Sequence, residues 1–207
     1  MAGEPRKEEF QELVKALSPL VENLRLMIGA ARHAFNQHSQ ARLEEMARLR
    51  KAFTLEIDPF FTGVEAGLKR GSVADEVYLL KFQGILTSLE LMAEKIGGLA
   101  DQLRYKANSG AILSDQDFFA VNNLFSTLTG FMRALVDIFE VDDPSLKEYL
   151  LQESRKLTDD WFRSETAHET GMMDSPGQPN AWSVYLSILA ASREIAGHLA
   201  DIVKSLD

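Results

Sequence analysis

One stretch of the sequence occurs twice, once near the middle of the chain and once close to its end. The first copy, ILTSLELMAEKIGGLADQL, spans Ile85–Leu103, and the second, VYLSILAASREIAGHLADI, spans Val184–Ile202. Aligned without a gap, the copies share three identical residues, namely Ile96 with Ile195, Gly98 with Gly197 and Ser88 with Ser187. The two copies lie 99 residues apart (195 − 96 = 99), nearly half the length of the 207-residue chain, which indicates two copies of one supersecondary unit.

Apolar side chains recur three or four residues apart within each copy. In the first copy they are Leu86, Leu89, Met92, Ile96, Leu99 and Leu103. This spacing is typical of an α-helix that buries one face. No stretch of the chain shows the strict alternation or the enrichment in β-branched residues of a strand, so the sequence predicts an all-α fold.

Two helices are predicted before the first copy of the repeat. An apolar stripe from Phe10 to Phe35 predicts the first helix, and Pro19 predicts a kink or a restart within it. A second helix is expected from about Gln40 to Gly71. The Asp58-Pro59 pair predicts a kink or a restart there too, because proline has no N–H group and clashes with the preceding turn.

Four further helices follow. Ser72 is a capping residue for a third helix that ends near Lys106, and Ser114 caps a fourth that carries its apolar stripe to Phe139. Asp143 and the first-turn proline start a fifth, Pro144–Thr170. The segment Gly171–Asn180, with two prolines and two glycines, predicts a loop before the last helix.

The predicted architecture is therefore six long antiparallel helices arranged as two three-helix repeats. Repeat one covers about residues 8–107 and repeat two about 114–206, within one domain of residues 1–207. Because three helices enclose little core by themselves, the two repeats are expected to pack together. The glycines Gly98 and Gly197, at matched positions, predict a close helix crossing.

Composition and charge exclude several classes of protein. The 22 basic and 31 acidic side chains give a net charge of −9, which nucleic-acid phosphates would repel. No segment approaches the roughly 18 uncharged apolar residues of a membrane span. The start, MAGEPRKEEF, lacks the apolar core of a secretory signal. With 0 cysteines the chain has no disulfide, thiol nucleophile or cysteine-bound zinc, and we expect a cytoplasmic protein.

Both copies of the repeat carry a family resemblance. Glu94–Leu103 and Arg193–Ile202 resemble the run LERIGDHAxNIA that ends each three-helix repeat of PhoU-like proteins. Ser164–His168 and the turn Gly171–Pro179 are similar to the last helix-turn-helix of the PhoU-like domains on sodium/phosphate cotransporters. The resemblance extends over Leu13–Leu206. It implies a helical bundle that controls phosphate uptake or metabolism through contact with a membrane transporter or a signalling protein.

The resemblance also implies metal clusters, held by two carboxylates one helical turn apart. This sequence departs from that pattern in both copies. The first copy keeps Glu94 but has Gly98 where the second carboxylate belongs, and the second copy has Arg193 and Gly197 at both positions. Glycine offers no ligand and arginine opposes a cation, so no cofactor is expected.

A divalent or ferric ion at an incomplete ligand set stays open as an alternative. The candidate ligands are Glu94, Asp101, Asp159, Asp160, Glu194, His198 and Asp201. His198 lies one turn from Glu194 and could share a site with Asp159 or Asp160; the other interpretation is a surface Glu–His pair. Asp101 is more simply explained as a solvated charge.

The other motifs are weaker indications of function. Di-iron bundles need two Glu-x-x-His motifs, and only Glu165–His168 has that spacing. The basic segment Arg42–Lys51 could face an acidic partner or a membrane surface, or be a solvated face paired with Glu44 and Glu45. His38 lies near a helix end, where a cationic imidazole would favour the helix dipole.

No nucleophile elbow, phosphate-binding loop or dinucleotide fingerprint is present, so we expect a protein that is not an enzyme. The leading hypothesis is a regulatory or adaptor protein of phosphate transport and homeostasis that docks on a transporter or signalling protein. Nucleic acid is not an expected partner, and membrane association is expected only through a partner. The alternatives are a carboxylate-rich metal-binding protein with a redox or storage role, and a structural bundle that forms a homo-oligomer.

Overall fold

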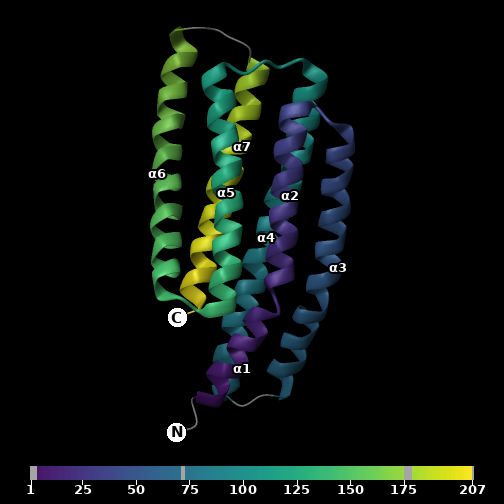
Figure 1. The fold of residues 1–207 in the computed structure, drawn as a ribbon, viewed down its shortest axis with the longest axis vertical. Coiled ribbons are helices and arrows are strands. Elements are labelled where there is room, and N and C mark those ends of the chain that lie inside the picture. The colour runs from purple at the N-terminus through teal and green to yellow at the C-terminus, as the bar shows by residue number, and fades with distance from the viewer. Residues whose placement is uncertain (1–3, 71–72, 175–178, 207) are drawn as a thin grey trace.

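The fold consists of long α-helices (Figure 1). The computed structural model describes residues 4–70, 73–174 and 179–206, with side chains for these ranges except 4–6, 73–74, 160–174 and 179. The helices are α1 (Glu4–Lys15), α2 (Ser18–Gln37), α3 (Gln40–Arg70), α4 (Val73–Ser109), α5 (Asp115–Val141), α6 (Pro144–Asp174) and α7 (Pro179–Ser205). Every regular element within the described ranges is helical, which confirms the predicted all-α class. None of these helices combines the length and the apolar composition that crossing a bilayer requires.

The first predicted helix is divided into α1 and α2. Pro19 lacks the N–H that would continue the hydrogen bonding of α1, and α1 ends at Lys15. The carbonyl of Leu17 then accepts hydrogen bonds from the N–H groups of Leu20 (2.9 Å) and Val21 (3.2 Å), which begin α2. Of the two predicted outcomes, a kink or a restart, the restart is correct.

Pro59 has a different effect. The helix α3 continues through it from Gln40 to Arg70, so of the two predicted outcomes, a kink or a restart, the restart is wrong. Near the proline, the Thr62 hydroxyl donates a hydrogen bond to the Asp58 carbonyl (3.1 Å).

The predicted start signals in the second half are confirmed. The Ser114 hydroxyl accepts a hydrogen bond from the N–H of Asp117 (3.1 Å) at the start of α5. The Asp143 carboxylate accepts one from the N–H of Ser145 (2.7 Å), directly before α6. The predicted loop Gly171–Asn180 is too long, however, because α6 continues to Asp174 and α7 begins at Pro179. A single helical glycine costs only about 1 kcal/mol, so Gly171 does not end the helix.

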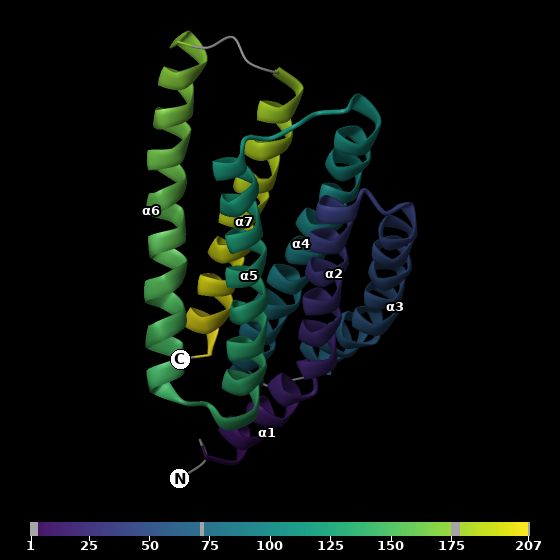
Figure 2. The same cartoon turned by 45° about the horizontal axis from the view of Figure 1, so that its top comes forward.

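Two of the three pairs of equivalent helices in the two repeats pack against each other. Helix α2 contacts α5, and α4 contacts α7, while α3 and α6 lie at opposite outer edges of the bundle (Figures 1 and 2). The α4–α7 pair, which carries the two copies of the repeated stretch, forms the most extensive contact between any two helices. Helix α1 has no counterpart in repeat two and lies against α4 and α5.

One hydrophobic core runs through both repeats. Ile96 of α4 and Ile195 of α7, the matched isoleucines, are fully buried in the same cluster, together with Leu99 and Leu199. Burying an isoleucine side chain stabilises a fold by about 1.5–3 kcal/mol. The repeated stretch is therefore the central seam of the bundle.

The predicted glycine crossing is wrong. Gly98 and Gly197 are exposed, and a Cβ added at either position would meet no neighbouring atom within 4 Å. Gly97 is the glycine with a close neighbour, since a Cβ there would lie 2.7 Å from Cδ of Arg50. The glycines match between the repeats on the outer face of each helix, away from the buried isoleucines, so they do not bring α4 and α7 together.

Candidate functional site

The first copy of the repeat presents its remaining ligand, Glu94, on the exposed face of α4 towards α3. Glu94 borders a surface hollow of about 310 Å³ together with Glu90, Thr87 and Arg50. The Arg50 side chain crosses this face against Gly97. A guanidinium group, which is always cationic, thus lies beside the acids that a metal ion would need.

The second copy places its acid in an ion pair. Glu194 Oε2 lies 2.7 Å from Nζ of Lys95, and this contact links α7 to α4 on the surface of the bundle. The hydrogen bond from Lys95 to Glu194 and the attraction of the carboxylate raise the pKa of Lys95. The predicted one-turn partnership between Glu194 and His198 is therefore dominated by a lysine from the other repeat.

His198 is half-buried on α7. Burial lowers its pKa most, Lys95 lowers it further, and the neighbouring carboxylates of Asp201 and Glu194 oppose both effects. The net direction favours a neutral imidazole, which can act as a ligand. The other acid in its surroundings, Asp201, is paired with Lys204 at 3.1 Å.

The remaining candidates are separate from one another. Asp101 pairs with Arg104 at 2.6 Å, and Asp159 is exposed on α6. The side chain of Asp160 and the Glu165–His168 pair lie outside the described side chains. In the part of the chain that is described, no three His, Asp or Glu side chains come together in a way that could hold a metal ion.

The residues present therefore do not fit the metal clusters that the family resemblance implies. Gly98, Arg193 and Gly197 occupy ligand positions, and the acids that are kept have cationic side chains nearby. Arg50 was not among the sequence-based site residues. It belongs to the basic segment Arg42–Lys51, but sequence spacing does not show which residue of that segment faces α4.

Sequence reasoning also missed Lys106, a buried lysine of α4 that contacts the C-terminal end of α2. Lys106 of α4 donates a hydrogen bond to the carbonyl of Phe35 (3.2 Å) and lies 4.7 Å from the centre of the Phe35 ring. Its Nζ is 2.7 Å from Nε2 of His38. Burial lowers the pKa of Lys106. Burial, and secondarily the charge of Lys106, lower the pKa of His38.

This arrangement corrects the expectation for His38. The cation at the negative end of the α2 dipole is Lys106, and His38 acts as a neutral acceptor beside it. His38 adopts a left-handed backbone conformation (φ 52°) where α2 ends. The contact joins α4 to the turn between α2 and α3, so its role is to fix the fold.

Large apolar side chains are exposed at the end of the bundle where the repeats join. Ile112, in the turn between α4 and α5, is 72% exposed, and Phe119, in the first turns of α5, is 65% exposed. Tyr105, near the end of α4, is 44% exposed and donates a hydrogen bond to Oδ1 of Asn180 in α7 (2.7 Å). We call Tyr105, Ile112 and Phe119 the junction patch. Exposed apolar groups of this kind often mark protein contacts.

Similar proteins were found by comparing the structure, and none by comparing the sequence. No protein-family model matches the sequence, and no curated protein is similar to it in sequence. The fold is similar to PhoU from Pseudomonas aeruginosa, with a TM-score of 0.81 and 14% identity over 98% of this chain and 96% of that one. It is also similar to the phosphate transport system regulatory protein PhoU from Streptococcus pneumoniae (TM-score 0.78, 17% identity, 97% and 94% covered). At these identities the likeness establishes a shared fold.

Proposed function

We propose that this protein is a non-enzymatic regulator of phosphate transport that acts as an adaptor, by docking on a partner protein. The observation that carries the proposal is the end-to-end likeness to PhoU from Pseudomonas aeruginosa, which covers 98% of this chain. Both repeats take part in that match. The Streptococcus pneumoniae protein, matched over 97% of this chain, is named as a phosphate transport system regulatory protein.

The proposed mechanism needs a body that keeps its shape. The continuous core and the α4–α7 seam provide one, because bending the bundle would expose buried isoleucines. A rigid body that binds one conformation of a partner better than another shifts the partner towards it. The partner would be the cytoplasmic part of a phosphate transporter or a signalling protein, and the net charge of −9 disfavours nucleic acid.

The junction patch is the docking face that we propose. Ile112 and Phe119 expose more than half of their area, and apolar anchors carry much of the binding energy at protein interfaces. Both residues precede or begin α5, outside the α4–α7 seam, so changing them should leave the core intact.

The proposal can be tested in the natural host. Deletion of the gene should alter phosphate uptake or its response to phosphate starvation, and the wild-type gene should restore it. The double variant Ile112→Asp/Phe119→Asp should fold, as circular dichroism would show, but fail to restore regulation. Leu55→Asp is the matched control, because Leu55 is 64% exposed on α3, away from the patch. Unchanged phosphate uptake in the deletion strain, in phosphate-rich and phosphate-poor medium, would overturn the proposal.

A further inference from the structure

A cavity of about 420 Å³ lies between α1, the start of α4 and the ends of α5 and α7. Its inner wall is formed by Phe10 and Val14 of α1 and by Ile138 and Phe139 of α5, all of them buried. Val77 of α4, which is 54% exposed, marks the mouth. The volume falls in the range of about 300–1,000 Å³ that is usual for small-molecule sites.

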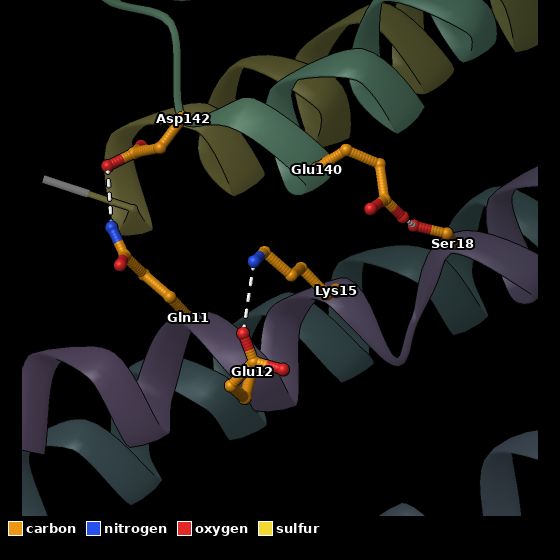
Figure 3. Close-up of polar contacts among 6 residues, drawn as sticks. All are labelled: Gln11, Glu12, Lys15, Ser18, Glu140 and Asp142. Carbon is orange, nitrogen blue, oxygen red and sulfur yellow. Dashed lines mark hydrogen bonds and ion pairs between the residues drawn. The ribbon is translucent and has the colours of Figure 1, made fainter.

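Hydrogen bonds and a ring contact hold α1 in place over this cavity. Gln11 Nε2 of α1 donates to Oδ2 of Asp142 (2.9 Å), and at the start of α2, directly after α1, the Ser18 hydroxyl donates to Oε1 of Glu140 (2.8 Å) (Figure 3). Phe10 packs on Tyr78 of α4 with ring centres 5.6 Å apart. The wall that α1 contributes is therefore tied to both α4 and α5.

The charged groups around the cavity are not balanced. Lys7 and Lys81 line it, and among the described residues neither forms an ion pair. The carboxylate that lines it, Asp142, is already engaged, because Oδ2 accepts from Gln11 and Oδ1 lies 2.7 Å from Nζ of Lys147. Two ammonium groups are thus left at an apolar cavity of a chain with a net charge of −9.

The backbone fixes this carboxylate in its engaged position. Asp142 caps α5 in a left-handed conformation (φ 50°), and its N–H donates to the carbonyl of Ile138 (2.9 Å). Its side chain is therefore not free to turn towards the lysines without giving up two partners. An anion from outside would satisfy the lysines without displacing any contact that is present.

We propose that this cavity binds a small amphiphilic anion, a carboxylate with an unbranched or ring-shaped apolar body about the size of a medium-chain fatty acid. The ammonium groups of Lys7 and Lys81 hold the carboxylate, and the apolar body enters between Val14 and Phe139. The inner wall offers few hydrogen-bonding groups, which disfavours a sugar or a nucleotide. This site is independent of the proposed docking at the junction patch, since the cavity lies at the start of α4 and the end of α5, whereas the patch lies at the opposite ends of these two helices.

The first test is an NMR titration of the full ¹⁵N-labelled chain with sodium octanoate, with 1-octanol as the uncharged counterpart. Saturable shifts should concentrate on amides of α1, the start of α4 and the end of α5. Octanoate should bind about tenfold or more tightly than octanol, as expected for a charge-assisted contact. Absence of saturable binding at millimolar octanoate, or equal affinity for the two compounds, would overturn the proposal.

Variants test where octanoate binds and which side chains supply the positive charge. Val77→Trp should close the mouth and abolish octanoate binding, whereas Leu55→Trp, at another exposed position, should not. Lys7→Met/Lys81→Met should weaken octanoate about tenfold and leave octanol unchanged, and the control Lys51→Met/Lys69→Met on α3 should bind like the wild type. Full octanoate binding by Val77→Trp, or an equal loss in the two lysine pairs, would show that the cavity is not the site.

Discussion

At the scale of single residues, the glycines at matched positions of the repeat are exposed helical residues with open space around them. Gly98→Ala and Gly197→Ala should therefore each raise the free energy of unfolding, by up to about 1 kcal/mol, because alanine restricts the unfolded chain and favours the helix. Urea unfolding followed by circular dichroism measures the change. Gly97→Ala is the control, since its Cβ would meet the Arg50 side chain and the gain should be smaller. A loss of stability in the first two variants would restore the idea of a close crossing.

His38 and His198 predict a dependence of stability on pH. Burial, and nearby Lys106 for His38, lower both pKa values below the usual 6.5, so the unfolded chain binds protons more readily than the folded one. Their contribution is present above about pH 6.5 and is lost as the pH falls through that value towards the folded-state pKa. The urea concentration at the midpoint of unfolding should therefore decrease as the pH is lowered from 7.5 to 5.5. His38→Asn/His198→Asn should flatten this dependence, since asparagine does not titrate and tolerates the left-handed conformation at 38.

The exposed His33 provides the comparison for that experiment. His33→Asn should keep the wild-type dependence of the midpoint on pH. If the double variant is as sensitive to pH as the wild type, the two histidines do not contribute through their folded-state surroundings.

At the scale of helices, the face between α3 and α4 decides whether a metal is held. Arg50 borders the same surface hollow as Glu94 and Glu90, and Lys95 pairs with Glu194 across the α4–α7 seam. We therefore expect no iron, zinc or manganese near stoichiometry in protein purified without chelators or an affinity tag, as elemental analysis would measure. Stoichiometric metal, lost in Glu94→Gln or His198→Gln, would support the storage or redox alternative instead.

The whole molecule is expected to unfold as one unit, because a single hydrophobic cluster joins the two repeats. Ile96→Ala and Ile195→Ala each create a cavity in that seam and should cost about 2–5 kcal/mol. Tryptophan fluorescence, which reports on Trp161 and Trp182 of repeat two, should give the same urea midpoint as circular dichroism in both variants. Separate midpoints would mean that the repeats are independent folding units.

The face of the helix on which a residue lies can be predicted in part from the sequence. The apolar stripe through Ile96, Leu99 and Leu103 already places Gly98 off the buried face. Two residues make about half a turn of a helix with 3.6 residues per turn, so residue 98 lies on the side of the helix opposite residue 96. Glycine's cost in a helix suggested a packing role that the periodicity does not support. Pro19 and Pro59 both lack an N–H group, yet a helix break precedes the first, whereas α3 continues through the second.

The sequence by itself determined the all-α class and the order of the long helices, because apolar periodicity and capping residues act over a few neighbouring positions. Only the tertiary structure decided which side chains meet across helices. Arg50 against Gly97, Lys106 beside His38, and Gln11 on Asp142 each join segments far apart in the chain. Such contacts depend on the rotation and relative height of packed helices, which are set by how all the side chains of the core fit together.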